Sequence, residues 1–170
     1  MHKFRITLVA TTAGALAIGV AALASGEQVK SHHRQGDRTF TIYAPTAANR
    51  LALVPVTKGQ FSLGDRTVFS DDLFTSKGGQ SLGTDGGVCT VTRIADASTG
   101  SGTLECEVTF SLPGGQITSQ ALNTLTSGNL VGTQVGAITG GTGVYRGATG
   151  ELAVRFLSNT EAYVTFYLGQ

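Results

Sequence analysis

The stretch from Ile138 to Leu152, ITGGTGVYRGATGEL, constrains the fold more than any other part of the chain. It holds five glycines in fifteen residues, and the apolar residues between them still follow the pattern of a β-strand. Only glycine adopts a positive φ without steric cost, and glycine in a strand also permits close backbone approach. The stretch therefore predicts sharp bends between closely packed strands.

A glycine-rich run can also bind phosphate, but it then precedes the N-terminus of a helix. Here no Lys-Ser or Lys-Thr pair follows the glycines, and Glu151–Phe156 alternates like a strand. We therefore favour a bend between strands over a phosphate loop.

Residues 1–24 have the pattern of a signal peptide. A positive segment, His2–Arg5, precedes the uncharged run Ile6–Leu23, and Ala22-Leu23-Ala24 fits the usual cleavage site. An uncleaved membrane anchor is the alternative, although the many small residues in the run favour cleavage. No second apolar run of spanning length follows. We expect a secreted protein with no membrane contact after cleavage.

The rest of the chain has a balanced charge. The 170 residues contain 12 Lys+Arg and 11 Asp+Glu, so loss of Lys3 and Arg5 with the signal peptide leaves a formal charge of −1. Because the charge balance shows no basic stripe, we expect no nucleic acid as a partner. Residues 25–37 are expected to be a flexible leader, and residues 38–170 a single domain. The leader carries the remaining histidines, His32 and His33, which lack the spacing of a metal site and disfavour a His-based catalytic triad.

The domain has the pattern of an all-β protein, because short alternating segments are separated by Gly, Asn, Asp and Ser turns. The expected strands are Arg38–Ala44, Leu51–Val56, Arg66–Thr75, Val88–Ile94, Thr103–Phe110, Gln116–Leu122, Leu130–Thr139, Val144–Leu157 and Ala162–Leu168, with a loop at Gly78–Gly87. A closed barrel of about eight strands fits this number, and its interior holds side chains or one small ligand. Closure also removes exposed sheet edges.

Two cysteines, Cys89 and Cys106, lie on expected strands that flank the turn Ala95–Gly102. A hairpin centred near Ala97 and Ser98 places them opposite each other, where Cβ atoms approach to about 4.5–5.5 Å. An exported protein favours a disulfide between them. Two reduced, buried thiols are the alternative.

The glycine-rich stretch resembles the GGtGxFxGaxG signature of the allene oxide cyclase and dirigent barrels. Other pieces resemble the cyclase in the same order from about Gln60 to the end of the chain: Leu63-Gly64-Asp65, Val68–Thr75, Gly87-Val88-Cys89, Gln116–Gln120 and Val164–Gly169. The resemblance implies an eight-stranded antiparallel barrel, usually a homotrimer, with an elongated cavity and neither a metal nor an organic cofactor. Plant cyclases convert a fatty-acid allene oxide to a cyclopentenone, and dirigent proteins guide the coupling of phenoxy radicals or cyclise small intermediates. We therefore expect a small apolar ligand and isomerase or cyclase activity.

Asp71 is the strongest candidate for a catalytic residue. It matches the cyclase asparagine that orients a water molecule at the epoxide oxygen, and it shares a strand face with Phe69 and Leu73. An ionised Asp only accepts hydrogen bonds, whereas a buried, protonated Asp is a general acid. A surface carboxylate beside a turn is the alternative.

Two departures from the cyclase pattern count against plant-type chemistry. No acidic residue occurs from Arg38 through Gly64, where the cyclase carries a glutamate that steadies cationic charge. Val108 stands near the position of a cavity tyrosine. These departures favour a second hypothesis, a non-catalytic secreted binding or interaction protein whose barrel is filled with side chains.

Four further residues are candidates for ligand binding. Gln120 lies on a strand that resembles the cyclase. Arg93 shares the face of Cys89 and would bind a carboxylate at the barrel mouth, with a surface arginine as the alternative. Tyr163 and Tyr167 alternate with apolar residues. Either strand face can be internal, and internal tyrosines would place hydroxyls over an apolar floor.

Overall fold

A computed structural model of the protein describes residues 38–169. The predicted signal peptide (1–24) and leader (25–37) lie outside the described residues. Within the described range, no helix is long and apolar enough to cross a membrane.

The described chain consists of β-strands joined by turns and two single-turn 3-10 helices. The elements are β1 (Arg38–Pro45), η1 (Ala48–Arg50), β2 (Leu51–Val54), β3 (Arg66–Phe69), β4 (Asp72–Phe74), β5 (Ser81–Asp96), β6 (Ser101–Leu112), β7 (Gly115–Thr126), β8 (Asn129–Leu130), β9 (Thr133–Gly141), η2 (Gly143–Tyr145), β10 (Thr149–Ser158) and β11 (Glu161–Gly169).

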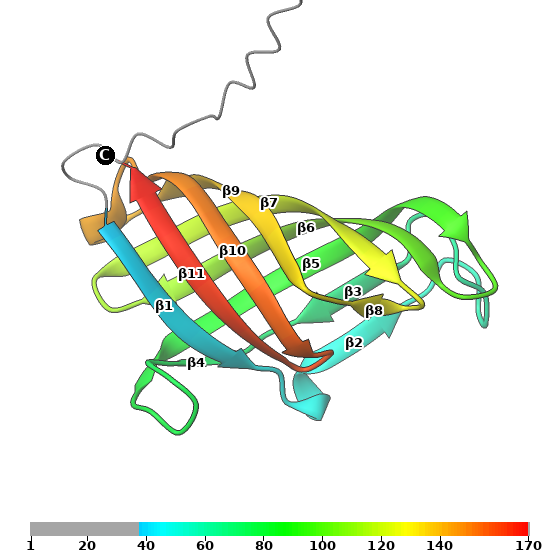
Figure 1. Ribbon diagram of the computed structural model, residues 1–170, viewed down its shortest axis with the longest axis horizontal. Helices are drawn as coiled ribbons and strands as arrows, with labels where there is room; N and C mark the ends of the chain where they lie inside the picture. The colour runs from blue at the N-terminus through cyan, green and yellow to red at the C-terminus, as the bar shows by residue number, and fades with distance from the viewer. Residues whose placement is uncertain (1–37, 170) are drawn as a thin grey trace, which may run out of the picture. The chain divides into compact units, whose positions relative to one another are not determined.

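Eight of these strands form a closed antiparallel ring in the order β5-β4-β1-β11-β10-β9-β7-β6, and β6 pairs with β5 to complete it (Figure 1). The first strand, β1, pairs along its whole length with the last, β11. Between β1 and β4 the register contains one pair, Tyr43 opposite Phe74. This ring confirms the predicted all-β, eight-stranded antiparallel barrel.

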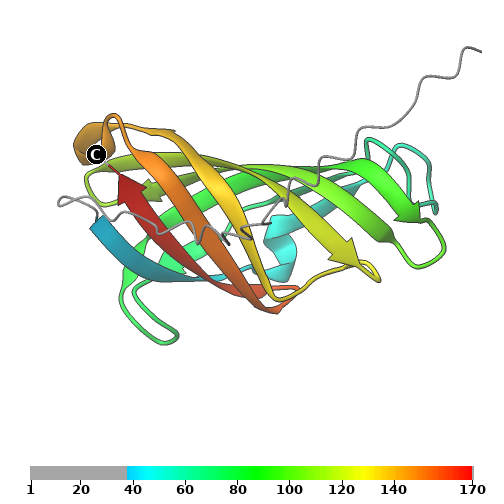
Figure 2. The ribbon, with the colours of Figure 1, turned by 45° about the horizontal axis from the view of Figure 1, so that its top comes forward.

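The long strand β5 supports the remaining part of the sheet. Its beginning pairs with β4 and its middle with β3, which in turn pairs with β2. The loop between β2 and β3 lies beside the β5–β6 turn at one end of the barrel (Figures 1 and 2). Two backbone hydrogen bonds fix this loop on β5, from Gly64 N–H to the Val91 carbonyl and from Val91 N–H to the Asp65 carbonyl, each 2.9 Å.

The expected loop at Gly78–Gly87 is wrong from Ser81 onward, because β5 already begins there. Packing requires one of its glycines. A Cβ atom at Gly87 would lie 2.5 Å from the ring of Phe69, which occupies that space inside the barrel. Gly87 therefore reflects close packing within a strand and not a flexible loop.

The glycine-rich stretch forms the predicted bend between β9 and β10. Gly143 has φ of +60° and Gly147 has φ of +77°, both in the region that favours glycine. A Cβ atom at Gly143 would collide with the carbonyl oxygen of Gly114. The bend contains η2 and lies at the end of the barrel opposite the β5–β6 turn (Figure 1).

The interior has two parts, which we call the sealed end and the open end. The sealed end is one cluster of buried side chains: Ile42, Ala44, Leu73, Phe110, Leu112, Ile117, Ile138, Tyr145, Ala148, Leu152, Val164, Phe166 and Leu168. Phe166 is fully buried at its centre, 5.0 Å edge-to-face from Phe110 and 4.7 Å from the stacked ring of Phe40. The open end is a smaller cluster of Cys89, Val91, Leu104, Cys106 and Leu125, against which Phe61 of the β2–β3 loop packs.

Candidate functional site

A cavity of about 720 Å³ lies inside the barrel, in contact with both clusters. Its walls are mainly apolar and come from β5, β6, β7, β10 and β11, while β2 and the β10–β11 turn contribute to its rim. Leu53 on this rim is 74% exposed. The interior is therefore not filled with side chains, and its volume is that of a site for a small organic ligand.

Two buried carboxylates, Asp71 and Asp85, line this cavity. Asp71 lies between β3 and β4, and Asp85 lies on β5. The backbone N–H of Asp71 donates to Oδ1 of Asp85 at 2.8 Å, and the N–H of Asp85 donates to the carbonyl oxygen of Asp71 at 3.0 Å. These reciprocal bonds hold the two acids side by side.

One oxygen of this acid pair has no partner. Oδ1 of Asp71 is buried and makes no hydrogen bond to any residue of the described chain. Buried polar atoms are nearly always hydrogen-bonded, because an unpaired one costs about 1–3 kcal/mol. An unpaired acceptor that lines a cavity is suited to a donor on a ligand.

Burial changes the ionisation of both acids. Desolvation, with a smaller contribution from the charge of Asp71, raises the pKa of Asp85 to about 7. Desolvation also raises the pKa of Asp71, and a hydrogen bond from Thr46 opposes this shift. The pair therefore keeps a proton at pH values where an ordinary aspartate is fully ionised.

The surroundings supply little positive charge to the pair. The neighbouring Asp72 is partly exposed and forms an ion pair with Arg50 at 2.5 Å. Among the described residues that line the cavity, Arg66 is the one basic side chain, and it lies on the exposed part of β3. The pair of Asp71 and Asp85 therefore makes this part of the cavity acidic.

A proton donor with a raised pKa beside an unpaired acceptor can give and take protons at one point of a bound molecule.

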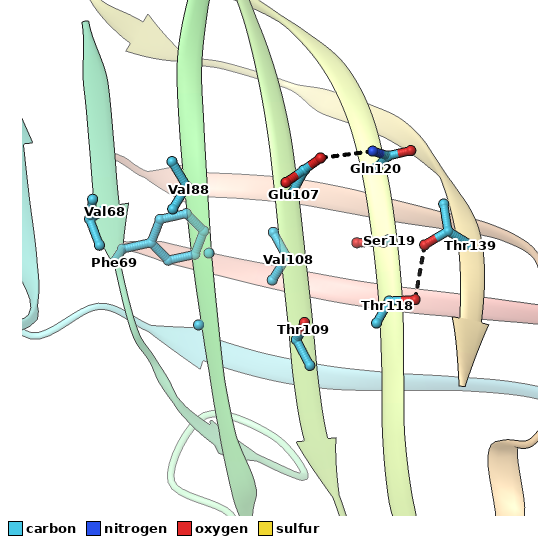
Figure 3. Close-up of a pocket in the computed structure, with 12 residues that line it drawn as sticks. Val68, Phe69, Val88, Glu107, Val108, Thr109, Thr118, Ser119, Gln120 and Thr139 are labelled. Carbon is cyan, nitrogen blue, oxygen red and sulfur yellow. Dashed lines mark hydrogen bonds between the residues drawn. The ribbon is translucent and has the colours of Figure 1, made fainter. Parts of the chain in front are cut away.

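The structure places Asp71 inside the barrel, on the inward face that it shares with Phe69 and Leu73. Gln120 lies elsewhere. It is on the outer face of β7, where its side chain donates to Glu107 at 2.9 Å (Figure 3). Gln120 belongs to a shallow outer groove of about 630 Å³ across β3, β5, β6, β7 and β9. The expectation that it shares a pocket with Asp71 is therefore corrected.

Arg93 also lies outside the cavity, because a β-bulge interrupts the alternation of inward and outward residues along β5. A β-bulge between Val91 and Arg93 shifts the pairing of β5 with β6, so that Arg93 stands opposite the outward-facing Thr103. A bulge inserts one residue and reverses the face of those that follow. Arg93 is exposed and does not share the inward face of Cys89.

Tyr163 and Tyr167 lie on the outer face of β11. The inward positions of this strand are the apolar ones, Ala162, Val164, Phe166 and Leu168. The ring of Tyr163 packs 5.4 Å from that of Tyr43, with the guanidinium of Arg155 at 5.0 Å. Neither tyrosine lines the cavity. Of the two alternatives for this strand, the one with both tyrosines on the outer face is therefore correct.

Cys89 and Cys106 form a disulfide between directly opposed positions of β5 and β6. Both are buried and contribute to the cavity wall. The predicted hairpin and pairing are confirmed, and the described residues contain no free cysteine.

Sequence reasoning missed two buried polar residues of the cavity, Asp85 and Asn123. Asp85 fell in the segment expected to be a loop. Asn123 lies on the inward face of β7, in alternation with the buried Ile117, and is 7% exposed. That alternation was the signal that could have identified Asn123.

Comparison with known proteins agrees with this geometry. The sequence profile of the allene oxide cyclase barrel-like domain matches residues 45–168. A solved structure of pyocyanin demethylase is 30% identical, with a TM-score of 0.63 over 76% of this chain and 99% of that one. The pterocarpan synthase dirigent protein GePTS1 is 20% identical (TM-score 0.58; 78% and 82% covered), and AbnU, an exo-specific intermolecular Diels-Alderase, is 14% identical (TM-score 0.53; 78% and 97% covered). The last two show a shared fold. No curated protein sequence matches the chain.

Proposed function

We propose, from the premise that this chain belongs to the allene oxide cyclase barrel-like family, that it binds a small, mostly apolar molecule in the barrel and isomerises or cyclises it by proton transfer. The observation that carries the proposal is the acid pair, because Oδ1 of Asp71 is an unpaired, buried acceptor that lines a cavity of about 720 Å³. We also propose that the protein is secreted after loss of residues 1–24 and that it forms a homotrimer.

In this proposal the two acids have different roles. Protonated Asp85 donates its proton to an oxygen of the ligand, and ionised Asp71 stabilises the positive charge that develops and then takes a proton from carbon. Bonds rearrange within the ligand, and the proton given is matched by the proton taken. The low polarity of the cavity strengthens both interactions. Three observations support this reading: the pKa of Asp85 is raised to about 7, the pair is acidic, and the compared structures act on small molecules.

The binding part is tested with Nile red, a neutral apolar dye, and decyl competitors of different charge. We expect the full chain to bind the dye and decylamine to displace it at least tenfold better than decanoate at pH 7. Asp71→Asn should remove that preference. The matched control is Asp72→Asn, because Asp72 is adjacent but lies on the other face. Equal displacement by amine and carboxylate would refute the role of the acid pair. Pyocyanin belongs in the same assay, because pyocyanin demethylase is similar to this chain.

The catalytic part is tested by deuterium exchange. The protein is incubated with 2-decanone in D₂O, and deuterium at the carbons beside the carbonyl is measured by mass spectrometry. An acid–base site should raise exchange at least tenfold above Asp71→Asn. Dye binding with no such exchange would support the alternative, a non-catalytic binding protein on the same barrel.

A further inference from the structure

The cavity contains a second polar group, the carboxamide of Asn123. Asn123 is 7% exposed and lines the cavity from β7. Its neighbours on the inward face are apolar: Leu104 is directly opposite it on β6, and Leu125 is the next inward residue of β7. No hydrogen bond joins its side chain to any other residue in the range 38–169. Because Asn123 lines the cavity, a ligand there can supply the hydrogen bonds that these residues do not.

Asn123 lies far from the acid pair. Asp85 is opposite Phe110, and Phe110 is opposite Ile117 on β7. Asn123 follows Ile117 by six residues on the same strand, which at a strand rise of about 3.3 Å corresponds to roughly 20 Å. The acid pair therefore adjoins the sealed end, while Asn123 lies among the residues of the open end. The cavity lining between the two includes Cys89, Cys106 and Val108, which are apolar.

The two polar groups differ in chemistry. The acid pair is anionic and lacks an internal cation, so it favours a cation or a strong donor. An uncharged carboxamide both donates and accepts, so it matches a hydroxyl, carbonyl or amide group. A charged group at Asn123 would lose its hydration without gaining an opposite charge.

We infer that Asn123 is a specificity-determining residue and that the ligand is an elongated, two-ended molecule, with a cationic or donor group at Asp71 and Asp85 and an uncharged hydrogen-bonding group at Asn123. This inference rests on the proposed function for the first of these groups. It adds an apolar spacer of about 12–15 Å between the polar ends, which is the strand distance shortened by the reach of the side chains.

The test compares two competitors that differ by one hydroxyl, dodecylamine and 12-amino-1-dodecanol, in displacement of Nile red from the full chain. We expect the hydroxyl to improve affinity at least fivefold in the wild type. Asn123→Leu should abolish that gain and leave the affinity for dodecylamine within twofold. Thr124→Val is the matched control, because Thr124 is the adjacent, exposed residue of β7. Asn123→Ala is the second variant if Asn123→Leu does not fold.

The outcomes separate the two proposals. If dodecylamine binds but the hydroxyl brings no gain, or if the gain survives in Asn123→Leu, the role of Asn123 is overturned and the proposed function stands. If dodecylamine does not displace the dye from the wild type, the proposed function fails, and this inference fails with it.

Discussion

The two ends of the barrel interior are built from the same strands but packed in opposite ways. At the sealed end, Ile42, Leu73, Ile117 and Phe166 are completely buried. They belong to one cluster of buried side chains that contains no acidic residue. The open end has a small cluster around a disulfide, and the cavity that borders both clusters holds the unpaired Oδ1 of Asp71. Dense packing stabilises a fold, whereas unpaired polar groups cost stability. The difference shows how one barrel can separate the residues that hold it together from those that line a cavity.

The largest expected effect is on stability, when a leucine is replaced by alanine at each end of the interior. Leu73→Ala should destabilise the protein by about 3–5 kcal/mol, because it leaves a new void at the sealed end. Leu104→Ala should cost less, about 2 kcal/mol, since Leu104 already borders the cavity and loses fewer contacts. Urea denaturation measures both. Equal losses would contradict the division of the interior.

The second prediction concerns pH. Asp85 has an ordinary pKa of 3.8 when unfolded and about 7 when folded, so the folded state holds the proton more tightly. The contribution of Asp85 to stability should therefore be full below about pH 4 and fall as the pH rises to 7, by at most about 4 kcal/mol. Asp85→Asn should flatten this fall in urea denaturation. Asp72→Asn should keep it, and equal pH profiles for the wild type and Asp85→Asn would contradict the burial of Asp85.

The third prediction tests the disulfide at the open end. Cys89 and Cys106 are 17 residues apart, and closing a loop of that length contributes about 3 kcal/mol in the chain-entropy description. Cys89→Ala/Cys106→Ala should lose about this much. A reducing agent should destabilise the wild type and leave the double variant unchanged. Ready labelling of either cysteine by a thiol reagent in native, unreduced protein would contradict the bond.

The smallest effects are expected on the outer face. Gln120→Ala and Arg93→Ala should change stability by less than about 0.5 kcal/mol, because both side chains are exposed. They should also leave Nile red binding unchanged. A clear loss of dye binding in either variant would mean that the ligand site extends beyond the cavity.

The overall fold could be predicted because its signals are local. The glycines at 143 and 147 require a bend, and the alternation in the segments around Cys89 and Cys106 places both cysteines on one face of a hairpin. Each of these features depends on backbone geometry that a few consecutive residues determine.

The site could be predicted only in part, because it depends on contacts between distant segments. Asp71 was identified because its position matches that of an asparagine in the allene oxide cyclases. Asp85 was missed because the glycines around it suggested a loop, although Gly87 lies in a strand where the ring of Phe69 leaves no room for a Cβ atom. Arg93 was assigned to the wrong face because a bulge has no reliable signature in the sequence. The sequence could not show whether Tyr163 and Tyr167 face the interior or the outside, because both faces of β11 are apolar enough to be internal.

The pairing of β1 with β11 also determines when the barrel can form. Arg38 is opposite Leu168 and Pro45 is opposite Glu161, so the ring joins the two ends of the described chain. Contacts between residues so distant in sequence make folding slow, because the loop entropy is lost before the contacts form. During synthesis, β1 has no partner on this side until residues 161–169 have emerged. Completion of the barrel is therefore a late event, and every truncation that removes β11 should leave the ring open.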